Sequence, residues 1–148
     1  MTVRRLLTLI VVALALVAAG CGDDDEGGDA AEEAALSADE AIAEIGLVRQ
    51  GLDEGLAAYA DGEAEQAEAL VGDAYLEHFE LVEPPLEEAD EELNESLEVL
   101  IRETLRDAIV TGENLTDVEK LVQQANAGLD QAEAALSGGQ GTAGGAGS

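Results

Sequence analysis

Residues 63–86 read EAEQAEALVGDAYLEHFELVEPPL. The apolar residues of this stretch recur three or four positions apart and do not alternate strictly with polar ones. That spacing is typical of an amphipathic helix with one face turned toward a core. It predicts a helix over residues 63–83 whose buried face consists of Ala67, Leu70, Val71, Ala74, Tyr75, Leu81 and Val82.

Two adjacent prolines, Pro84 and Pro85, follow this helix. Proline lacks an amide hydrogen and restricts the residue before it, so the pair predicts that the helix ends or kinks here. A reversal would start an antiparallel helix near Pro85, whereas a kink would continue one long helix, and both alternatives stay open. The next apolar stripe stops near Thr111-Gly112 and consists of Leu86, Ala89, Leu93, Leu97, Leu100, Ile101 and Ala108.

The same spacing continues on both sides of this region. Ser37 with Glu40 matches a capping box, a signature of helix starts, and Thr116 with Glu119 repeats it. The first helix ends near residue 61 and buries Ile42, Ile45, Val48, Leu52, Leu56 and Tyr59. The last helix buries Val118, Leu121, Val122, Ala125, Leu129, Ala132 and Leu136. Four such helices with short connections predict an all-α fold, an up-down four-helix bundle over residues 37–137.

The N-terminal residues have the layout of an export signal. Arg4 and Arg5 precede an apolar run over residues 6–19, which is shorter than the ~20 residues that a permanent membrane helix needs. Residues 17–21, VAAGC, resemble the bacterial lipobox, in which small residues precede a cysteine that carries lipid. We expect residues 1–20 to be removed and Cys21 to anchor the chain to the outer, extracytoplasmic face of a membrane. The alternative is an ordinary secretory signal cleaved near Ala19.

Two segments of simple composition flank the predicted helices. Residues 21–36 hold consecutive acidic residues, Gly and Ala, and almost no large apolar side chain, which predicts a lipidated, acidic and disordered tether. Residues 138–148 are mostly Gly and Ala and predict a disordered tail. The chain has one cysteine, so the domain between these segments must be stabilised by packing and not by a disulfide.

Charge limits the classes of function. The chain has 34 acidic residues against six basic ones and a formal net charge of −28 at pH 7. Removal of Arg4 and Arg5 with the signal would leave 34 acidic residues against four basic ones, a net charge of −30. Such a field repels nucleic acid and attracts cations or basic protein surfaces. We therefore expect no nucleic-acid partner.

The residue patterns that catalysis needs are missing from the sequence. It has no Gly-rich phosphate loop, no His-Glu zinc motif and no Ser, His and Asp spacing that stands out. Lipidation would also consume the thiol of Cys21. We therefore expect a protein that is not an enzyme.

Two polar side chains fall on predicted buried faces. His78 lies on the stripe of the second helix, and a buried imidazole needs hydrogen-bond partners. If the chain reverses at the prolines, Asp90 and Glu91 lie level with His78 and supply one. Arg49 lies on the stripe of the first helix and needs a carboxylate. Such a core cluster would bind a metal or move a proton; the alternative is a structural histidine and an arginine whose stem packs while its charge reaches water.

Carboxylates also gather along the second helix. Asp73, Glu77 and Glu80 are spaced four and three residues apart, so they form a ladder on one flank. Hard cations take oxygen ligands, and a nitrogen from histidine would make the set suitable for iron, copper or zinc. The candidate metal ligands are therefore Asp73, Glu77, His78, Glu80, Glu83 and Asp90.

Several short motifs occur together in the same region. Residues 59–62 read YADG, residues 69–71 ALV, residues 73–76 DAYL, residues 79–80 FE, and residues 83–84 EP. With Leu97-Glu98 and Leu105-Arg106 beyond them, these motifs resemble the extracytoplasmic helical domain of the high-affinity iron permease family, here as a stand-alone lipoprotein. The likeness spans residues 57–136. The Arg-Glu-Gly-x-Glu element of the permeases is absent, because Thr104 follows Arg102-Glu103.

The resemblance implies a function beside a transporter. It carries over Asp73, Tyr75, Phe79, Glu80 and Glu83 as motif positions, and it implies an accessory of iron or other metal cation uptake that binds or hands over cations near a permease. The ion implied is iron or another divalent or trivalent cation. The alternative is a non-catalytic acidic interaction module for a basic protein partner at the cell envelope. Phe79 beside the ladder is then either an anchor for that partner or a half-buried core aromatic.

Overall fold

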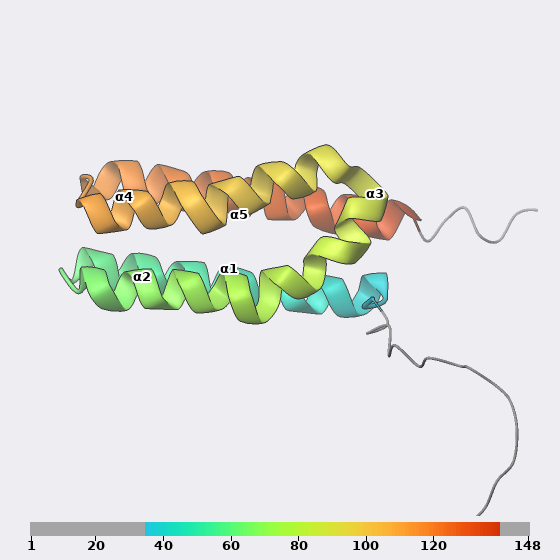
Figure 1. Ribbon diagram of the computed structural model, residues 1–148, viewed down its shortest axis with the longest axis horizontal. Helices are drawn as coiled ribbons and strands as arrows, with labels where there is room; N and C mark the ends of the chain where they lie inside the picture. The colour runs from blue at the N-terminus through green and yellow to red at the C-terminus, as the bar shows by residue number, and fades with distance from the viewer. Residues whose placement is uncertain (1–34, 140–148) are drawn as a thin grey trace, which may run out of the picture. The chain divides into compact units, whose positions relative to one another are not determined.

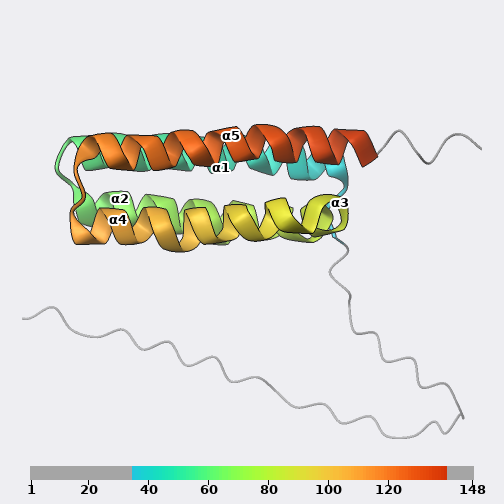
Figure 2. The same ribbon diagram turned by 90° about the horizontal axis from the view of Figure 1, so that it is seen from above.

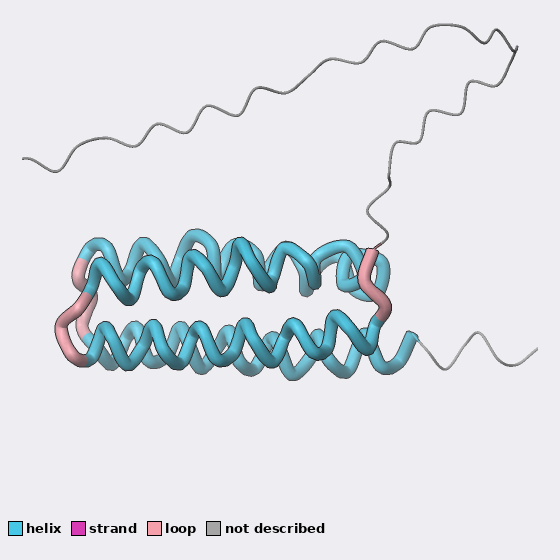
Figure 3. The backbone as a smooth tube through the Cα atoms, turned by 90° about the horizontal axis from the view of Figure 1, so that it is seen from below, coloured by secondary structure: helices cyan, strands magenta, loops and turns pink. Residues whose placement is uncertain are grey.

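The computed structural model describes residues 35–139, and within them the chain forms helices and no strand (Figure 3). The prediction of an all-α fold is confirmed. The elements are α1 (Ala38–Ala60), α2 (Ala64–Asp73), η1 (Ala74–Phe79), α3 (Glu80–Glu98), η2 (Val99–Leu105), α4 (Arg106–Thr111) and α5 (Leu115–Gly139), where η denotes a π-helical segment. They join into three continuous helical segments over 38–60, 64–111 and 115–139, so the predicted number of four helices is wrong.

The middle segment bends at Asp90 and not at the prolines. Pro84 and Pro85 lie inside α3, whereas Asp90 leaves the helical conformation, with φ −160° and ψ 88°. Its Oδ1 accepts a hydrogen bond of 3.0 Å from the amide of Leu93. An aspartate in this extended conformation caps the first turn of the helix that follows, which favours a bend at this residue. The prediction that Pro84 and Pro85 end or kink the helix is therefore wrong by several residues.

After the bend, the second half of the middle segment runs back in the opposite direction to its first half. In Figure 1, α1 and α2 run together in one layer, α4 and α5 run together in the other, and α3 crosses between the layers. Figure 2 shows the same rods from above, with α5 over α1 and α4 beside α2. The contacts agree, since α1 packs on α2 and α5, α2 on α4, and α3 on α5.

The core follows the predicted stripes at most positions. Ile45, Leu52, Val71 and Leu129 are fully buried, and partly buried side chains pack around the core, namely Ile42, Leu56, Tyr59, Leu70, Leu93, Leu100 and Leu121. Asn94 is buried although no stripe predicted it.

Two core predictions around η1 and α3 are wrong, and one further residue is buried that no predicted stripe contains. Leu81 is 45% exposed, Ala89 is exposed, and Phe79 is fully buried. Phe79 lies four residues after Tyr75 and three before Val82, which are both buried, so the same helical spacing that marks the stripe places it inside. A buried phenylalanine is not available as the surface anchor that the sequence suggested.

Three helix ends agree with the local sequence signals that predicted them, and the start of α5 does not. Ser37 and Glu40 form the predicted capping box, and the first segment and the middle segment end before Gly62 and Gly112, which have positive φ angles of 84° and 76°. The start of α5 differs, because the Oδ1 of Asn114 accepts the amide hydrogen of Asp117 at 3.1 Å and the helix begins at Leu115. The predicted cap at Thr116 and Glu119 is therefore wrong.

The predicted ends of the chain lie largely outside the described residues. This holds for the signal over residues 1–20, for Cys21, for most of the tether over residues 21–36, and for most of the tail over residues 138–148. The helix α5 continues to Gly139, two residues beyond the predicted domain end. Among the described residues, none of the helices is both long and apolar enough to cross a membrane.

Candidate cation-binding site

The structure divides the six predicted metal ligands among four places. Asp73, Glu77 and His78 line one pocket, Glu83 contacts a tyrosine, and Asp90 caps a helix at the bend. Glu80 is exposed. Across residues 35–139, no three His, Cys, Asp or Glu side chains are placed together so that they could hold a metal ion.

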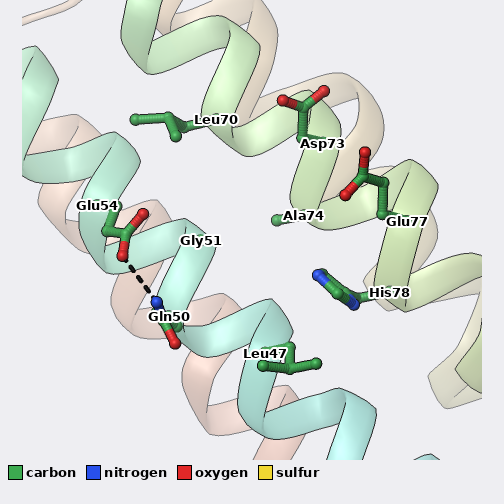
Figure 4. Close-up of a pocket in the computed structure, with 9 residues that line it drawn as sticks. All are labelled: Leu47, Gln50, Gly51, Glu54, Leu70, Asp73, Ala74, Glu77 and His78. Atoms are coloured by element: carbon green, nitrogen blue, oxygen red, sulfur yellow. Dashed lines mark hydrogen bonds between the residues drawn. The ribbon is translucent and has the colours of Figure 1, made fainter.

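The pocket lies on the seam where α1 packs against α2 and η1 (Figure 4). Its volume is about 160 Å³, and it is lined by Leu47, Gln50, Gly51, Glu54, Leu70, Asp73, Ala74, Glu77 and His78. The two helices approach closely beside it, since a Cβ atom built on Gly51 would lie 2.6 Å from the Cβ of Ala74. A glycine at position 51 is therefore required by the packing of α1 on η1.

His78 is held from α1 and not from α3. Its Nδ1 lies 2.7 Å from Oε2 of Glu44, and the two side chains are 28% and 24% exposed. The prediction that Asp90 or Glu91 lies level with His78 is wrong. Twelve residues separate His78 from Asp90 along a helix that does not reverse at the prolines, which corresponds to roughly 18 Å.

Two carboxylates of the pocket have no internal partner. Glu54 accepts a hydrogen bond of 2.8 Å from Gln50, whereas Asp73 and Glu77 form no ion pair or hydrogen bond through their carboxylates with any described residue. Figure 4 shows Asp73, Glu77 and His78 on one side of the seam and Glu54 on the other. Leu47, Leu70 and Ala74 supply apolar surface between them. The pocket therefore combines negative charge with apolar lining.

The basic residues of the helical domain are all engaged in ion pairs. Arg49 on α1 pairs with Asp130 at 2.8 Å and with Glu133 at 3.1 Å, which confirms that this inward arginine takes carboxylate partners. The other pairs are Arg102 with Glu98 and Glu103, Arg106 with Glu68, and Lys120 with Asp117. Within residues 35–139, no arginine or lysine is left to neutralise the negative charge of the pocket.

A second polar cluster joins the two halves of the middle segment. The hydroxyl of Tyr75 on η1 donates to Oε1 of Glu83 at 2.9 Å, and the guanidinium of Arg102 on η2 lies 5.8 Å from the centre of the Tyr75 ring. Burial, together with the bond to Glu83, raises the pKa of Tyr75 to about 12. Burial also raises the pKa of Glu83, while the hydrogen bond from Tyr75 lowers it and the charge of Glu98 raises it further.

The raised pKa of Glu83 predicts a stabilising substitution. Because the folded state favours protonated Glu83, its contribution to stability is present below the unfolded pKa of about 4.5 and is lost as the pH rises through the folded value. At pH 7 the ionised side chain therefore destabilises the fold. Glu83→Gln keeps an oxygen for the Tyr75 hydroxyl and removes the charge, so the variant should have a higher Tm than the wild type at pH 7 and a similar Tm near pH 4.

Thermal melts at both pH values check this prediction. Glu87→Gln is the matched control, because Glu87 lies on the same helix, is exposed, and loses the same charge. The burial of the Glu83 charge would be contradicted if the Tm of Glu83→Gln at pH 7 were equal to or lower than that of the wild type, while the Tm of Glu87→Gln were higher.

The residues that sequence reasoning missed come from α1. Glu44, Gln50 and Glu54 were not singled out, although Glu44 lies three residues after Ala41 and four before Val48, which are both buried. An acidic residue at the spacing of an apolar stripe was the available signal. Its partner on another helix could not be read from the sequence, because that depends on how α1 and η1 pack.

Comparison with protein-family models, with curated proteins and with solved structures gives no match. The resemblance to the extracytoplasmic domain of iron permeases therefore remains a prediction from short motifs.

Proposed function

We propose that this protein is a lipid-tethered, non-catalytic acidic module that binds a basic protein partner outside the cytoplasm. The helical domain would be an up-down four-helix bundle in which the bent middle segment supplies two of the rods. Cys21 would hold it at the membrane through the tether over residues 21–36. The observation that carries the proposal is the engagement of all described arginines and lysines in ion pairs, which leaves the excess carboxylates without internal counter-charge.

The size of that excess supports a basic partner. The formal net charge of the chain is −28, and it becomes −30 if the signal with Arg4 and Arg5 is removed. Charge of one sign raises the association rate of oppositely charged partners and repels nucleic acid and anionic lipid headgroups. The hydroxyl of Tyr75 lies beside the carboxylate of Glu83, but its pKa is raised to about 12, so it is not activated as a nucleophile and a binding function fits the site better than catalysis does.

A role in metal cation uptake is the second candidate. It is favoured by one observation, that three of the predicted ligands, Asp73, Glu77 and His78, share a pocket. It has less support because no three such side chains are placed together around a metal ion within the described residues, and because Glu44 already engages His78 Nδ1. We therefore rank the capture of iron or another cation for a permease below the binding of a basic protein.

Calorimetry on the mature protein separates the two candidates. We expect a lysine-rich decapeptide to bind saturably at low salt and to bind about tenfold more weakly when the NaCl concentration rises from roughly 0.05 to 0.3 M. The same peptide with every lysine acetylated is the control and should not bind. Fe(III), Fe(II), Mn(II) and Cu(II) should bind no more tightly than they bind a scrambled acidic helix.

The outcomes decide between the functions. Equal binding of the acetylated peptide, or no saturation by the lysine-rich one, would remove the proposal of a basic partner. Tight, stoichiometric binding of one metal with no peptide binding would move the metal-uptake role to first place.

A further inference from the structure

We propose that the chain forms a domain-swapped dimer with a second copy of itself by straightening at Asp90. Residues 64–111 of each copy would then form one continuous helix about 72 Å long. Each bundle of the dimer would take its first half, residues 38–89, from one copy and its second half, residues 91–139, from the other. This inference does not depend on the proposed function.

The bend at Asp90 lacks the features that fix the other two turns. Residues 61–63 and residues 112–114 each contain a glycine with positive φ, a conformation that ends a helix and that other residues rarely adopt. Within α3 only Asp90 leaves the helical conformation, and it does so at a negative φ. Connections between packed helices usually take about two to eight residues. A connection of a single residue is therefore a hinge of the kind that favours exchange between copies.

The segment around the hinge makes no contact with the core. Residues 87–92 are all exposed and read EEADEE. Glutamate and alanine are strong helix formers, so this segment favours a helix that continues through the hinge, and Asp90 is its weakest helix former. The bend is held by the hydrogen bond of 3.0 Å from the amide of Leu93 to Oδ1 of Asp90. Straightening would replace that bond with backbone hydrogen bonds that a helix end leaves unmade.

The contacts between the two halves can form again between two copies. The halves pack through α1 on α5 and through α2 on α4. The ion pairs of Arg49 with Asp130 and of Arg106 with Glu68 cross the same interface. A swapped dimer keeps these contacts and changes only which copy supplies each half, which makes exchange a low-cost route to a dimer.

Charge sets the conditions under which the dimer forms. Each copy has a formal net charge of −28, so two copies repel each other, and salt screens that repulsion. The dimer should therefore become more stable as the NaCl concentration rises, whereas the binding of a basic peptide should become weaker. The two opposite salt dependences allow either proposal to fail without the other.

Sedimentation velocity on the mature chain measures the dimer. Cys21→Ser removes both the lipid and the thiol, so that neither a micelle nor a disulfide joins two copies. We expect a dimer whose association constant rises at least about fivefold between roughly 0.05 and 0.3 M NaCl. A chain that stays monomeric up to about 1 mM at both salt concentrations would overturn the proposal.

A variant at the hinge should strengthen the dimer. Asp90→Ala removes the cap and introduces a better helix former, so the association constant should rise at least about tenfold. Asp53→Ala is the matched control, because it removes the same charge from an exposed position inside α1, and it should change the constant by less than about twofold. Equal effects of the two variants would contradict a hinge at Asp90.

A second variant should lock the bend. Glu91→Pro places proline at the first position of the helix after Asp90, where its missing amide hydrogen is tolerated, and it disfavours the helical conformation of the residue before it. The variant should therefore be a folded monomer with a Tm at or above that of the wild type. A dimer that persists in Glu91→Pro would mean that two copies meet at another surface, and the proposal would be wrong.

Charge reversal distinguishes swapping from other dimers. Arg106→Glu and Glu68→Arg each place like charges across the interface of the halves, both in the monomer and in the dimer of that variant. A swapped dimer that contains one copy of each variant regains opposite charges at both places. We expect an equimolar mixture, incubated until copies exchange, to contain at least about threefold more dimer than either variant alone. A mixture with no gain would exclude the exchange of halves.

Discussion

Replacing Phe79 with alanine should lower the free energy of unfolding by about 3–5 kcal/mol, the usual result of removing a fully buried phenylalanine. Phe79 is 0% exposed and its ring centre lies 5.9 Å from that of Tyr75, so the truncation opens a cavity inside the helical domain. Since small domains are stable by only about 5–15 kcal/mol, this is a large share of the total. Urea unfolding followed by circular dichroism measures it.

Leu76→Ala is the matched control for Phe79→Ala. Leu76 lies on the same π-helical segment but is 56% exposed, so the variant should stay within about 0.5 kcal/mol of the wild type. The sequence is compatible with Phe79 as a half-buried core aromatic, and also with Phe79 as a surface anchor for a partner. A Phe79→Ala protein that unfolds like the wild type but loses peptide binding would restore that interpretation and contradict the buried position.

Replacing Gly51 with leucine should have the second largest effect. The Cβ of any residue at this position would lie 2.6 Å from the Cβ of Ala74, and neither atom can rotate away, so α1 and η1 must separate. We expect a net loss of about 2 kcal/mol or more, after allowance for the better helix propensity of leucine. In a domain of this size that lowers the Tm by roughly 10 °C.

Gly46→Leu is the control for this substitution. Gly46 lies on the same helix, and a Cβ there would meet no atom within 4 Å, so the variant should gain helix propensity and melt at or slightly above the wild-type temperature. Equal Tm values for the two leucine variants would show that α1 and η1 do not approach closely at Ala74. The pocket beside that contact would then lose its geometric basis.

The sequence predicts local features of this fold better than it predicts how the chain turns. The capping box at Ser37 and the positive-φ glycines at Gly62 and Gly112 were found, because each depends on residues within one helical turn. The bend was placed at Pro84-Pro85, although the structure keeps both prolines inside α3. The actual bend at Asp90 depends on one aspartate side chain that caps the following helix. In so acidic a chain, the sequence does not distinguish this aspartate from the many other acidic residues.

The candidate site was predicted in part for the same reason. Asp73, Glu77 and His78 lie near one another along the chain, and one pocket contains all three. Asp90 was added through an assumed reversal that does not occur at the prolines, and Glu83 was added as a motif position; each has a different partner in the structure. Glu44, which holds His78, comes from another helix, and only the packing of α1 on η1 identifies it.

Recruitment of a basic peptide to a membrane that carries the lipidated protein tests whether the acidic helical domain binds a basic partner at a membrane surface. The mature lipoprotein would be placed in neutral phosphatidylcholine vesicles, and a fluorescent lysine-rich decapeptide would be sedimented with them. We expect recruitment well above that of bare vesicles, loss of most of it at about 0.3 M NaCl, and none with the acetylated peptide. Recruitment equal to that of bare vesicles at low salt would contradict the account.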